Sequence, residues 1–452
     1  MIPVVTPEEM GRIDAAAPEP TEVLIERAGA AVARAAVRML GGTYGRRIVV
    51  LAGKGNNGND GRAAARRLGL RGAAVEVVAA AEAPRRLPPA DLVIDAAYGT
   101  GFRGAWTAPD AGSAQVLAVD IPSGVDGLTG TASDGVLPAD RTVTFAALKP
   151  GLLFPPGLVY PGEIEVADIG LDVRTARIHL VELSDVQEWV VPRAVDSHKW
   201  HAAVFAVAGS PGMTGAARLL TAGAFRAGAG YVRLATPGGE HDPNVPTEVV
   251  VQALPAVSWA GAVTKGLDRF QSLVVGPGLG RHDVTTTEVR TLVATANLPV
   301  VVDGDGLFAL AWSSDGAAAL LRNRRAPTVL TPHDGEFGML AGHRPGPDRI
   351  DEARRLANTT GAVVLLKGPA TVVAEPRGRV LIANAGDERL ATAGSGDVLS
   401  GILGALLAQQ VPPFQAAAAA AWLHGTAARR GALRGFMASD LPGQLPDVLD
   451  EL

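Results

Sequence analysis

The chain has 452 residues, of which 47% are hydrophobic and 19% are charged, and its net charge is −5. This composition predicts folded globular domains and excludes an intrinsically disordered chain. Acidic and basic residues are interspersed, which argues against nucleic-acid binding, and the absence of cysteine excludes disulfides, thiolate zinc sites and a cysteine nucleophile.

The length predicts two domains. The first residues carry acids where a signal peptide needs a basic patch, and no stretch of about 20 apolar residues occurs in the sequence. We therefore expect a cytoplasmic protein without a nucleic-acid or membrane partner. The oligomeric state is open, with a homo-oligomer as one alternative.

The first part of the chain alternates apolar runs with helical patterns. Thr6 precedes Pro7 and Glu9, which is typical of a capped helix start. The further elements expected are a helix over residues 26–40, a strand over 46–53, a helix over 61–72, and strands over 73–80, 91–99 and 115–124. Strands that alternate with helices form parallel sheets, so we expect an α/β domain with a site at the carboxyl ends of its strands.

The alternation stops near residues 184–198, which places a domain boundary there and predicts domains over 1–190 and 191–452. A second alternating set follows. Its expected elements are strands over 201–210, 231–236, 272–280, 299–306, 327–336 and 361–370, a helix over 216–230, a hairpin over 371–384 and a helix over 397–410. Both domains are thus predicted to be α/β, each with a mainly parallel sheet and flanking helices.

A glycine-rich turn, ATAGSGDVLSG, opens the last of these helices. The amides of Gly394, Ser395 and Gly396 and the positive end of the helix dipole favour an anion at one point, where Asp397 also stands. Asp397 by itself could be no more than a favourable dipole partner. VGPGLG, LTPHDGE and KGPAT follow other strands, however, and the four turns together predict a site for a phosphate-bearing ligand such as a nucleotide.

These four turns, together with GSPGMTGAARLLTAGAFRAGAGYV, resemble the ADP-dependent NAD(P)H-hydrate dehydratases, a ribokinase-like family, over nearly all of residues 197–430. The resemblance implies that nicotinamide cofactor hydrated at C6 is dehydrated at the expense of a phosphoryl group of ADP, with Mg²⁺ as cofactor. Asp397 would take the proton of the C6 hydroxyl. The hydrate-binding residues that the resemblance implies are Ala216, Gly278, His333 and Asp397. The nucleotide-binding residues that it implies are Lys367, Gly368, Pro369, Ala370, Thr371 and Gly396. A histidine such as His333 more often caps a helix.

The N-terminal half contains AGKGNNGNDG between a strand and a helix. Gly53, Gly55 and Gly58 formally satisfy the dinucleotide-binding fingerprint, but Glu76 lies inside a strand and not at its end, which puts the ribose-binding acid in doubt. The many amide and carboxylate side chains of this segment suit a weakly held cation and a polar ligand better.

This segment, with DLVIDAAYGTGFRG and VLAVDIPSGVDG, resembles the NAD(P)H-hydrate epimerases, with a Rossmann-like fold, over about residues 5–180. The implied hydrate-binding residues are Asn56, Asn57, Gly58, Asn59, Asp60, Gly99, Thr100, Gly101, Phe102, Arg103, Gly104, Ala105 and Asp120. The implied K⁺ ligands are Asn57, Asp95 and Ser123. Asp120 is the acid/base candidate, with a structural turn-former as the alternative. Asn59 stands where the family has glycine, but asparagine adopts a left-handed backbone conformation more readily than most residues, so the segment can tolerate it.

Together the halves resemble the bifunctional NAD(P)H-hydrate repair enzymes, which act on the hydrates NADHX and NADPHX. Two alternatives are kept: a ribokinase-like small-molecule kinase, and an N-terminal half that serves only as a ligand-binding or scaffolding module. The residues themselves do not decide between ADP and ATP, or between the two hydrates. The resemblance favours ADP.

Overall fold

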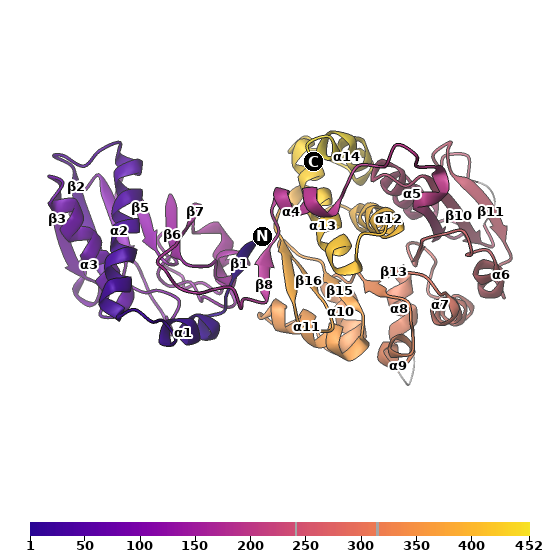
Figure 1. Cartoon of the computed structure of the whole chain (residues 1–452), viewed down its shortest axis with the longest axis horizontal. Helices are drawn as coiled ribbons and strands as arrows, with labels where there is room; N and C mark the ends of the chain where they lie inside the picture. Colours follow the sequence, from indigo (N-terminus) through magenta and orange to yellow (C-terminus); the bar gives the residue numbers. More distant parts are fainter. Residues whose placement is uncertain (240–241, 313–315) are drawn as a thin grey trace. The chain divides into compact units, whose positions relative to one another are not determined.

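The computed structural model describes residues 1–239, 242–312 and 316–452, which form two compact units (Figure 1). One unit comprises residues 2–178, and the other begins at residue 179. Residues 179–190, which the sequence placed with the N-terminal half, pack with the second unit because Val186 and Val190 are buried in its core. No helix of the described ranges is both long and apolar enough to cross a membrane.

The first unit contains one parallel sheet with its helices beside it. Its elements are β1 (Ile2–Val4), α1 (Pro7–Ala15), α2 (Thr21–Leu40), β2 (Arg47–Ala52), α3 (Asn56–Gly69), β3 (Ala74–Ala79), β4 (Leu92–Ala96), β5 (Gln115–Val119), β6 (Arg141–Phe145) and β7 (Glu163–Ala167). The predicted cap at Thr6 begins α1 as a capping box: the Thr6 side chain accepts from the Glu9 backbone N–H, and the Glu9 side chain accepts from the Thr6 backbone N–H. The sequence predicted the type of α1, α2, β2, α3, β3, β4 and β5, although several boundaries differ by a few residues, whereas β1, β6 and β7 were not among the expected elements.

The strands of this unit lie in the order β3-β2-β4-β5-β6-β7, and every pair is parallel. The carboxyl ends of β2, β4, β5 and β6 therefore share one edge. Helices α2 and α3 pack against each other, α2 on β5 and β6 and α3 on β2, β3 and β4. Apolar side chains of α2, α3 and the strands form the core between them.

The second unit holds a larger sheet. Its elements are β8 (Ile178–Leu180), α4 (Leu183–Trp189), β9 (Ala203–Val207), α5 (Thr214–Arg226), β10 (Tyr231–Pro237), β11 (Val250–Leu254), α6 (Ala260–Lys265), β12 (Ser272–Val275), α7 (Asp283–Thr295), β13 (Val300–Val302), α8 (Asp305–Ala311), α9 (Gly316–Arg322), β14 (Thr328–Leu330), α10 (Asp334–Ala341), α11 (Arg349–Thr360), β15 (Val363–Leu366), β16 (Thr371–Ala374), β17 (Val380–Ala383), α12 (Ser395–Ala408), α13 (Pro413–Arg430) and α14 (Leu441–Leu449). β16 and β17 are antiparallel, as the predicted hairpin requires.

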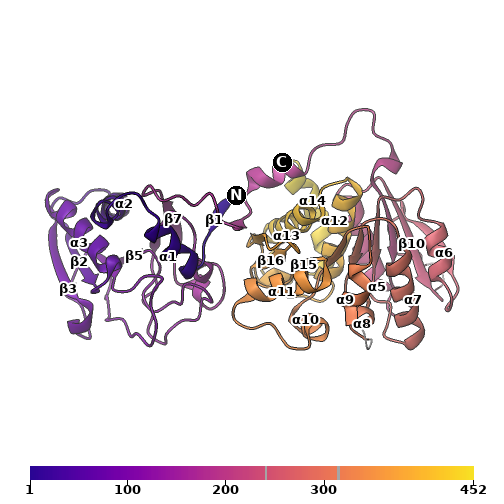
Figure 2. The same cartoon turned by 60° about the horizontal axis from the view of Figure 1, so that its bottom comes forward.

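Helices lie in two layers around this sheet. Its strands include the run β17-β16-β15-β14-β13-β12-β9-β10-β11, in that order. One layer contains α5, α12, α13 and α14, which pack on one another and on the strands. The other contains the chain of touching helices from α6 to α11, of which α7, α8 and α9 lie side by side in the turned view (Figure 2). β9 to β15 are mutually parallel, so their carboxyl ends meet at one edge.

Candidate active sites

A cavity of about 760 Å³ lies at the carboxyl ends of β2, β4, β5 and β6 in the first unit, with α1 and α2 as its other wall. Predicted hydrate-binding residues that line it are Asn56, Asn57, Asp60, Gly99, Thr100, Gly101, Phe102, Arg103 and Asp120. Gly58, Asn59, Gly104 and Ala105 do not line it. The parallel sheet thus brings residues from three separate segments to one cavity.

Asp120 lies at the base of this cavity, one residue past β5. Its φ of 69° is rare for a residue with a Cβ atom. Its Oδ1 lies 2.6 Å from Nζ of the buried Lys149, and its Oδ2 accepts a hydrogen bond of 3.2 Å from the Thr100 N–H. Burial by itself would raise the pKa of Asp120, but the Lys149 ammonium and the hydrogen bonds outweigh burial and lower it. Asp120 is therefore a carboxylate at neutral pH.

Two more carboxyl groups line the cavity, Asp60 on α3 and Asp14 on α1. Burial first, and then the negative charges of Asp120 and Asp14, raise the pKa of Asp60 to about 8. Burial also raises the pKa of Asp14, with Lys149 opposing and Asp120 adding to the shift. At neutral pH Asp60 is therefore protonated while Asp120 is ionised, which places a proton donor and a proton acceptor in one cavity.

The polar glycine segment begins α3 instead of forming a long loop. A Cβ atom on Gly58 would lie 2.0 Å from the carbonyl oxygen of Gly53, so this close approach requires glycine. Asn59 donates its backbone N–H to the carbonyl of Gly55 at 3.1 Å, inside the helix, and its φ is not positive. No left-handed conformation is needed at Asn59, because the position is helical and accepts asparagine without strain.

The three predicted K⁺ ligands show two different environments. The buried carboxylate of Asp95 accepts hydrogen bonds from the Ser123 N–H at 2.9 Å and the Ser123 hydroxyl at 2.6 Å. Burial raises the pKa of Asp95, although these bonds oppose the shift. Asn57, by contrast, has a buried side-chain amide for which the described residues offer no hydrogen-bond partner. An orphaned amide oxygen of this kind is a suitable ligand for a hard cation.

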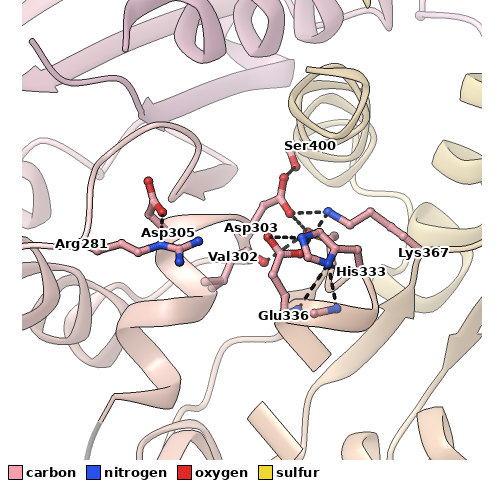
Figure 3. Close-up of polar contacts among 10 residues, drawn as sticks. Arg281, Val302, Asp303, Asp305, His333, Glu336, Lys367 and Ser400 are labelled. Carbon is pink, nitrogen blue, oxygen red and sulfur yellow. Dashed lines mark hydrogen bonds and ion pairs between the residues drawn. The ribbon is translucent and has the colours of Figure 1, made fainter. Parts of the chain in front are cut away.

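In the second unit a buried ionic cluster lies at the carboxyl ends of β13, β14 and β15 (Figure 3). Nζ of Lys367 lies 2.9 Å from Oδ1 of Asp303 and 3.5 Å from Oε2 of Glu336. Asp303 also accepts hydrogen bonds of 2.8 Å from the hydroxyls of Thr331 and Ser400. Burial alone would lower the pKa of Lys367, but the two carboxylates outweigh it and raise the pKa, so the side chain is an ammonium.

Asp397 stands beside this cluster in the first turn of α12. Gly394 begins the helix at a φ of 92°, and a Cβ atom on Gly396 would lie 3.4 Å from Nζ of Lys367. Burial first, and then the negative charge of Asp303, raise the pKa of Asp397 to about 7 against the opposing charge of Lys367. A carboxylate that served only as a dipole partner would have a lowered pKa. The environment thus favours a proton acceptor over that alternative.

His333 caps α10, as the alternative interpretation of this residue held. Its ring Nδ1 accepts hydrogen bonds from the backbone N–H groups of Gly335 at 2.9 Å and Glu336 at 3.3 Å. The backbone N–H of His333 donates in turn to Oε2 of Glu336. Because Nδ1 accepts these two hydrogen bonds, Nε2 is the ring nitrogen left to donate. The side chain is 60% exposed, so it can cap the helix and donate to a ligand at the same time.

The other predicted positions fall into two groups. A Cβ atom on Gly278 would lie 3.0 Å from Cβ of Ala216, so these hydrate-binding positions meet. The predicted nucleotide segment over residues 367–371 leads from β15 into β16, with Gly368 and Pro369 exposed. A larger cavity of about 890 Å³, lined by α5, residues 244–248 and α14, contains none of the predicted site residues.

Sequence reasoning missed Asp14, Asp303 and Glu336 as members of these sites, and Lys149 was not among its site residues. Asp303 had a usable signal, because it ends an apolar strand in the same way as Asp95 and Asp120 do. Asp14 had none, since an aspartate on a helix is ordinary until the helix covers a cavity.

Comparisons with known proteins match both halves of the chain. The family model described as NAD(P)H-hydrate dehydratase matches residues 204–449, and the model described as YjeF-related protein N-terminus matches residues 21–87 and 81–151. Proteins named bifunctional NAD(P)H-hydrate repair enzyme Nnr are similar over most of the chain. The protein of Moorella thermoacetica is 37% identical over 99% of this chain and 97% of its own length. That of Mycobacterium leprae is 40% identical over 94% and 92%.

Solved structures resemble the second unit. The ADP/ATP-dependent NAD(P)H-hydrate dehydratase of Bacillus subtilis, co-crystallised with ATP and Mg²⁺, has a TM-score of 0.50 and 29% identity over 59% of this chain and 95% of that chain. A ribokinase-like superfamily protein of Enterococcus faecalis has a TM-score of 0.54 at 21% identity over 61% and 96%, and shows the fold alone. With both halves matched along nearly their whole length, the chain belongs to the family of bifunctional NAD(P)H-hydrate repair enzymes.

Proposed function

We propose that the second unit dehydrates the S form of NADHX and NADPHX with ADP, giving AMP and inorganic phosphate. The observation that carries this proposal is Asp397, whose raised pKa of about 7 makes it a base next to the Lys367 ammonium at the start of α12. Asp397 takes the proton of the C6 hydroxyl as that oxygen attacks the β-phosphoryl group of ADP. Lys367 and the amides of the α12 turn stabilise the negative charge on the phosphoryl oxygens.

The nucleotide substrate enters as its Mg²⁺ complex. Asp303, Glu336 and Asp397 surround the single ammonium of Lys367, so an uncomplexed polyphosphate would meet excess negative charge. Chelation by Mg²⁺ removes part of that repulsion. The phosphorylated C6 oxygen then leaves as inorganic phosphate when the lone pair of N1 forms an iminium, and loss of a C5 proton restores the dihydronicotinamide ring. No redox partner is needed, because the hydrate loses only the elements of water, and its C6 oxygen leaves in the inorganic phosphate as ADP becomes AMP.

The first unit, residues 2–178, supplies the epimerase activity, and we assign dehydration to the second unit, which begins at residue 179. Asp120, held ionised by Lys149, accepts the proton of the C6 hydroxyl, and the protonated Asp60 donates a proton to the ring nitrogen as the C6–N1 bond opens. The resulting aldehyde closes on its other face with the two proton transfers reversed. The R form is thereby converted to the S form.

The donors of the first unit suit K⁺. The orphaned amide of Asn57, the Asp95 carboxylate and the Ser123 hydroxyl supply the oxygen ligands that such an ion prefers. When bound there, K⁺ would attract the substrate's phosphates. Asn57→Leu, compared with the native chain over a range of K⁺ concentrations, should abolish the K⁺ dependence of epimerisation. We also propose a cytoplasmic location, which the absence of cysteine supports.

The decisive experiment incubates the full chain with mixed hydrate epimers, with and without MgADP, and follows the ultraviolet absorbance of the dihydronicotinamide. We expect complete recovery of reduced cofactor with MgADP, and release of inorganic phosphate in equal amount. A stable phosphoester would instead indicate a small-molecule kinase. ATP in place of ADP tests the nucleotide preference.

Variants separate the two activities. Asp397→Ala should abolish dehydration and leave epimerisation intact, whereas Asp120→Ala should allow only the S epimer to be cleared. If Asp120→Ala still clears both epimers, the first unit is not the epimerase, and a ligand-binding or scaffolding role is the better account.

A further inference from the structure

Asp303 occupies the centre of the polar network in the second unit, although it is not among the site residues predicted from the sequence. It follows β13 directly and is 3% exposed. Its contacts come from three other segments: Thr331 after β14, Lys367 after β15 and Ser400 within α12. Figure 3 shows the Lys367 ammonium and the Ser400 hydroxyl converging on this one carboxylate.

The two oxygens of Asp303 serve different parts of the site. Oδ1 accepts from Lys367 and Thr331, and Oδ2 accepts from Ser400. Ser400 lies three residues after Asp397 on α12, on neighbouring turns of the helix. The carboxylate therefore connects the cation expected at the phosphoryl group with the helix that carries the base.

We propose that Asp303 is a positioning residue for dehydration, which holds the Lys367 ammonium against the start of α12 and, through Ser400, fixes the helix that carries Asp397. This inference rests on the proposed function of the second unit. It assigns Asp303 no contact with the substrate. Its role is to keep the phosphoryl-binding cation and the base in one alignment.

Lys367 has a second carboxylate partner, which shows why the position of its ammonium group depends on Asp303. Glu336 lies 3.5 Å from the ammonium, against 2.9 Å for Asp303. Without the Asp303 charge, Lys367 is attracted to Glu336 on α10, away from Gly396. Misplacing a catalytic group by about 1 Å can cost about 10² in rate. The effect should fall on kcat, because Asp303 does not contact the bound substrate.

The charges around Asp397 provide a second readout. The charged groups that face it are Asp303, Glu336 and Asp305, which raise its pKa, and Lys367, which lowers it. His424 on α13 lies under the same turn, but burial lowers its pKa to about 4, so it is neutral. Asp303 raises the pKa of Asp397 more than Lys367 lowers it. Removing the negative charge of Asp303 should therefore lower the pKa of Asp397 even if Lys367 moves towards Glu336, and should shift the acid limb of the dehydration rate to lower pH.

The test compares Asp303→Asn with the native full chain, using the S hydrate and MgADP. We expect kcat to fall by about 10², the KM for the hydrate to stay within about threefold, and the acid limb to move below pH 7. Glu352→Gln is the matched control: it neutralises another buried carboxylate of this unit, on α11, and should leave kcat and the acid limb unchanged. Epimerase activity of the same samples reports on the first unit.

Three results would overturn the inference: an unchanged kcat in Asp303→Asn, an unmoved acid limb, or an equal loss in the control. If Asp303→Asn does not fold, Ser400→Ala replaces it, since it removes one of the contacts and retains the charge. That variant should lower kcat severalfold with the acid limb in place, and a native kcat would refute the role. If the native chain itself does not dehydrate the hydrate, the proposed function fails instead.

Discussion

Asp397→Asn should stabilise the second unit at alkaline pH while it abolishes dehydration. The native environment raises the pKa of Asp397 from 3.8 to about 7, since burial and the nearby carboxylates disfavour the ionised form. A shift of one pKa unit corresponds to about 1.36 kcal/mol, so a shift of roughly three units corresponds to about 4 kcal/mol as an upper bound. Asparagine has nearly the same shape and no charge, so the variant avoids this cost.

The sign of the pH dependence follows from the raised pKa. Below about pH 4 the carboxyl group is protonated in both the folded and the unfolded chain, and its ionisation costs the fold nothing. As the pH rises to 7, the unfolded chain loses the proton first, so the native protein loses stability relative to Asp397→Asn. The difference in the free energy of unfolding should be about 1.5 kcal/mol at pH 5 and up to about 4 kcal/mol at pH 8.

The assay is urea unfolding at pH 5 and pH 8, with separate transitions fitted for the two units and dehydration measured on the same samples. The transition of the first unit serves as the internal reference. The matched control is Asp283→Asn, because Asp283 is an exposed aspartate in the first turn of α7. It should change the free energy of unfolding by less than about 1 kcal/mol, independently of these two pH values. An equal stability of Asp397→Asn and the native chain at pH 8 would refute the assigned environment.

Two further predictions concern the first unit. Lys149→Met leaves the buried Asp120 carboxylate without its partner, so the free energy of unfolding of the first unit in urea should fall by about 3–5 kcal/mol. Epimerisation should also fall, while dehydration of the S form continues. A native rate of epimerisation in this variant would contradict the role of the pair. Gly58→Ala should abolish epimerisation, because its Cβ would lie 2.0 Å from the Gly53 carbonyl oxygen. The control is Gly55→Ala, which has no atom within 4 Å of its Cβ and should remain active. Equal epimer conversion rates in the two variants would disprove the steric argument.

Local patterns explain how far the sequence could predict the fold. The apolar runs and glycine turns predicted parallel sheets in both halves, because strand periodicity and glycine conformation depend on neighbouring residues. The predicted start of α3 was wrong, since the segment that begins at Asn56 is polar enough to be typical of a loop. β11 was not predicted, because its partly exposed residues lack the buried run of a central strand.

The sequence by itself determined that Asp120 follows an apolar strand and that Asp397 stands at the start of a helix opened by a glycine-rich turn, which made both residues candidates. Only the tertiary structure decided their partners. Lys367 and Asp303 lie 64 positions apart in the chain, and Asp14 reaches its cavity only because α1 covers it. The protonation states of Asp60, Asp120 and Asp397 depend on burial and on charges brought from distant segments. Desolvation and Coulomb interactions act through space, so no pattern of neighbouring residues contains them.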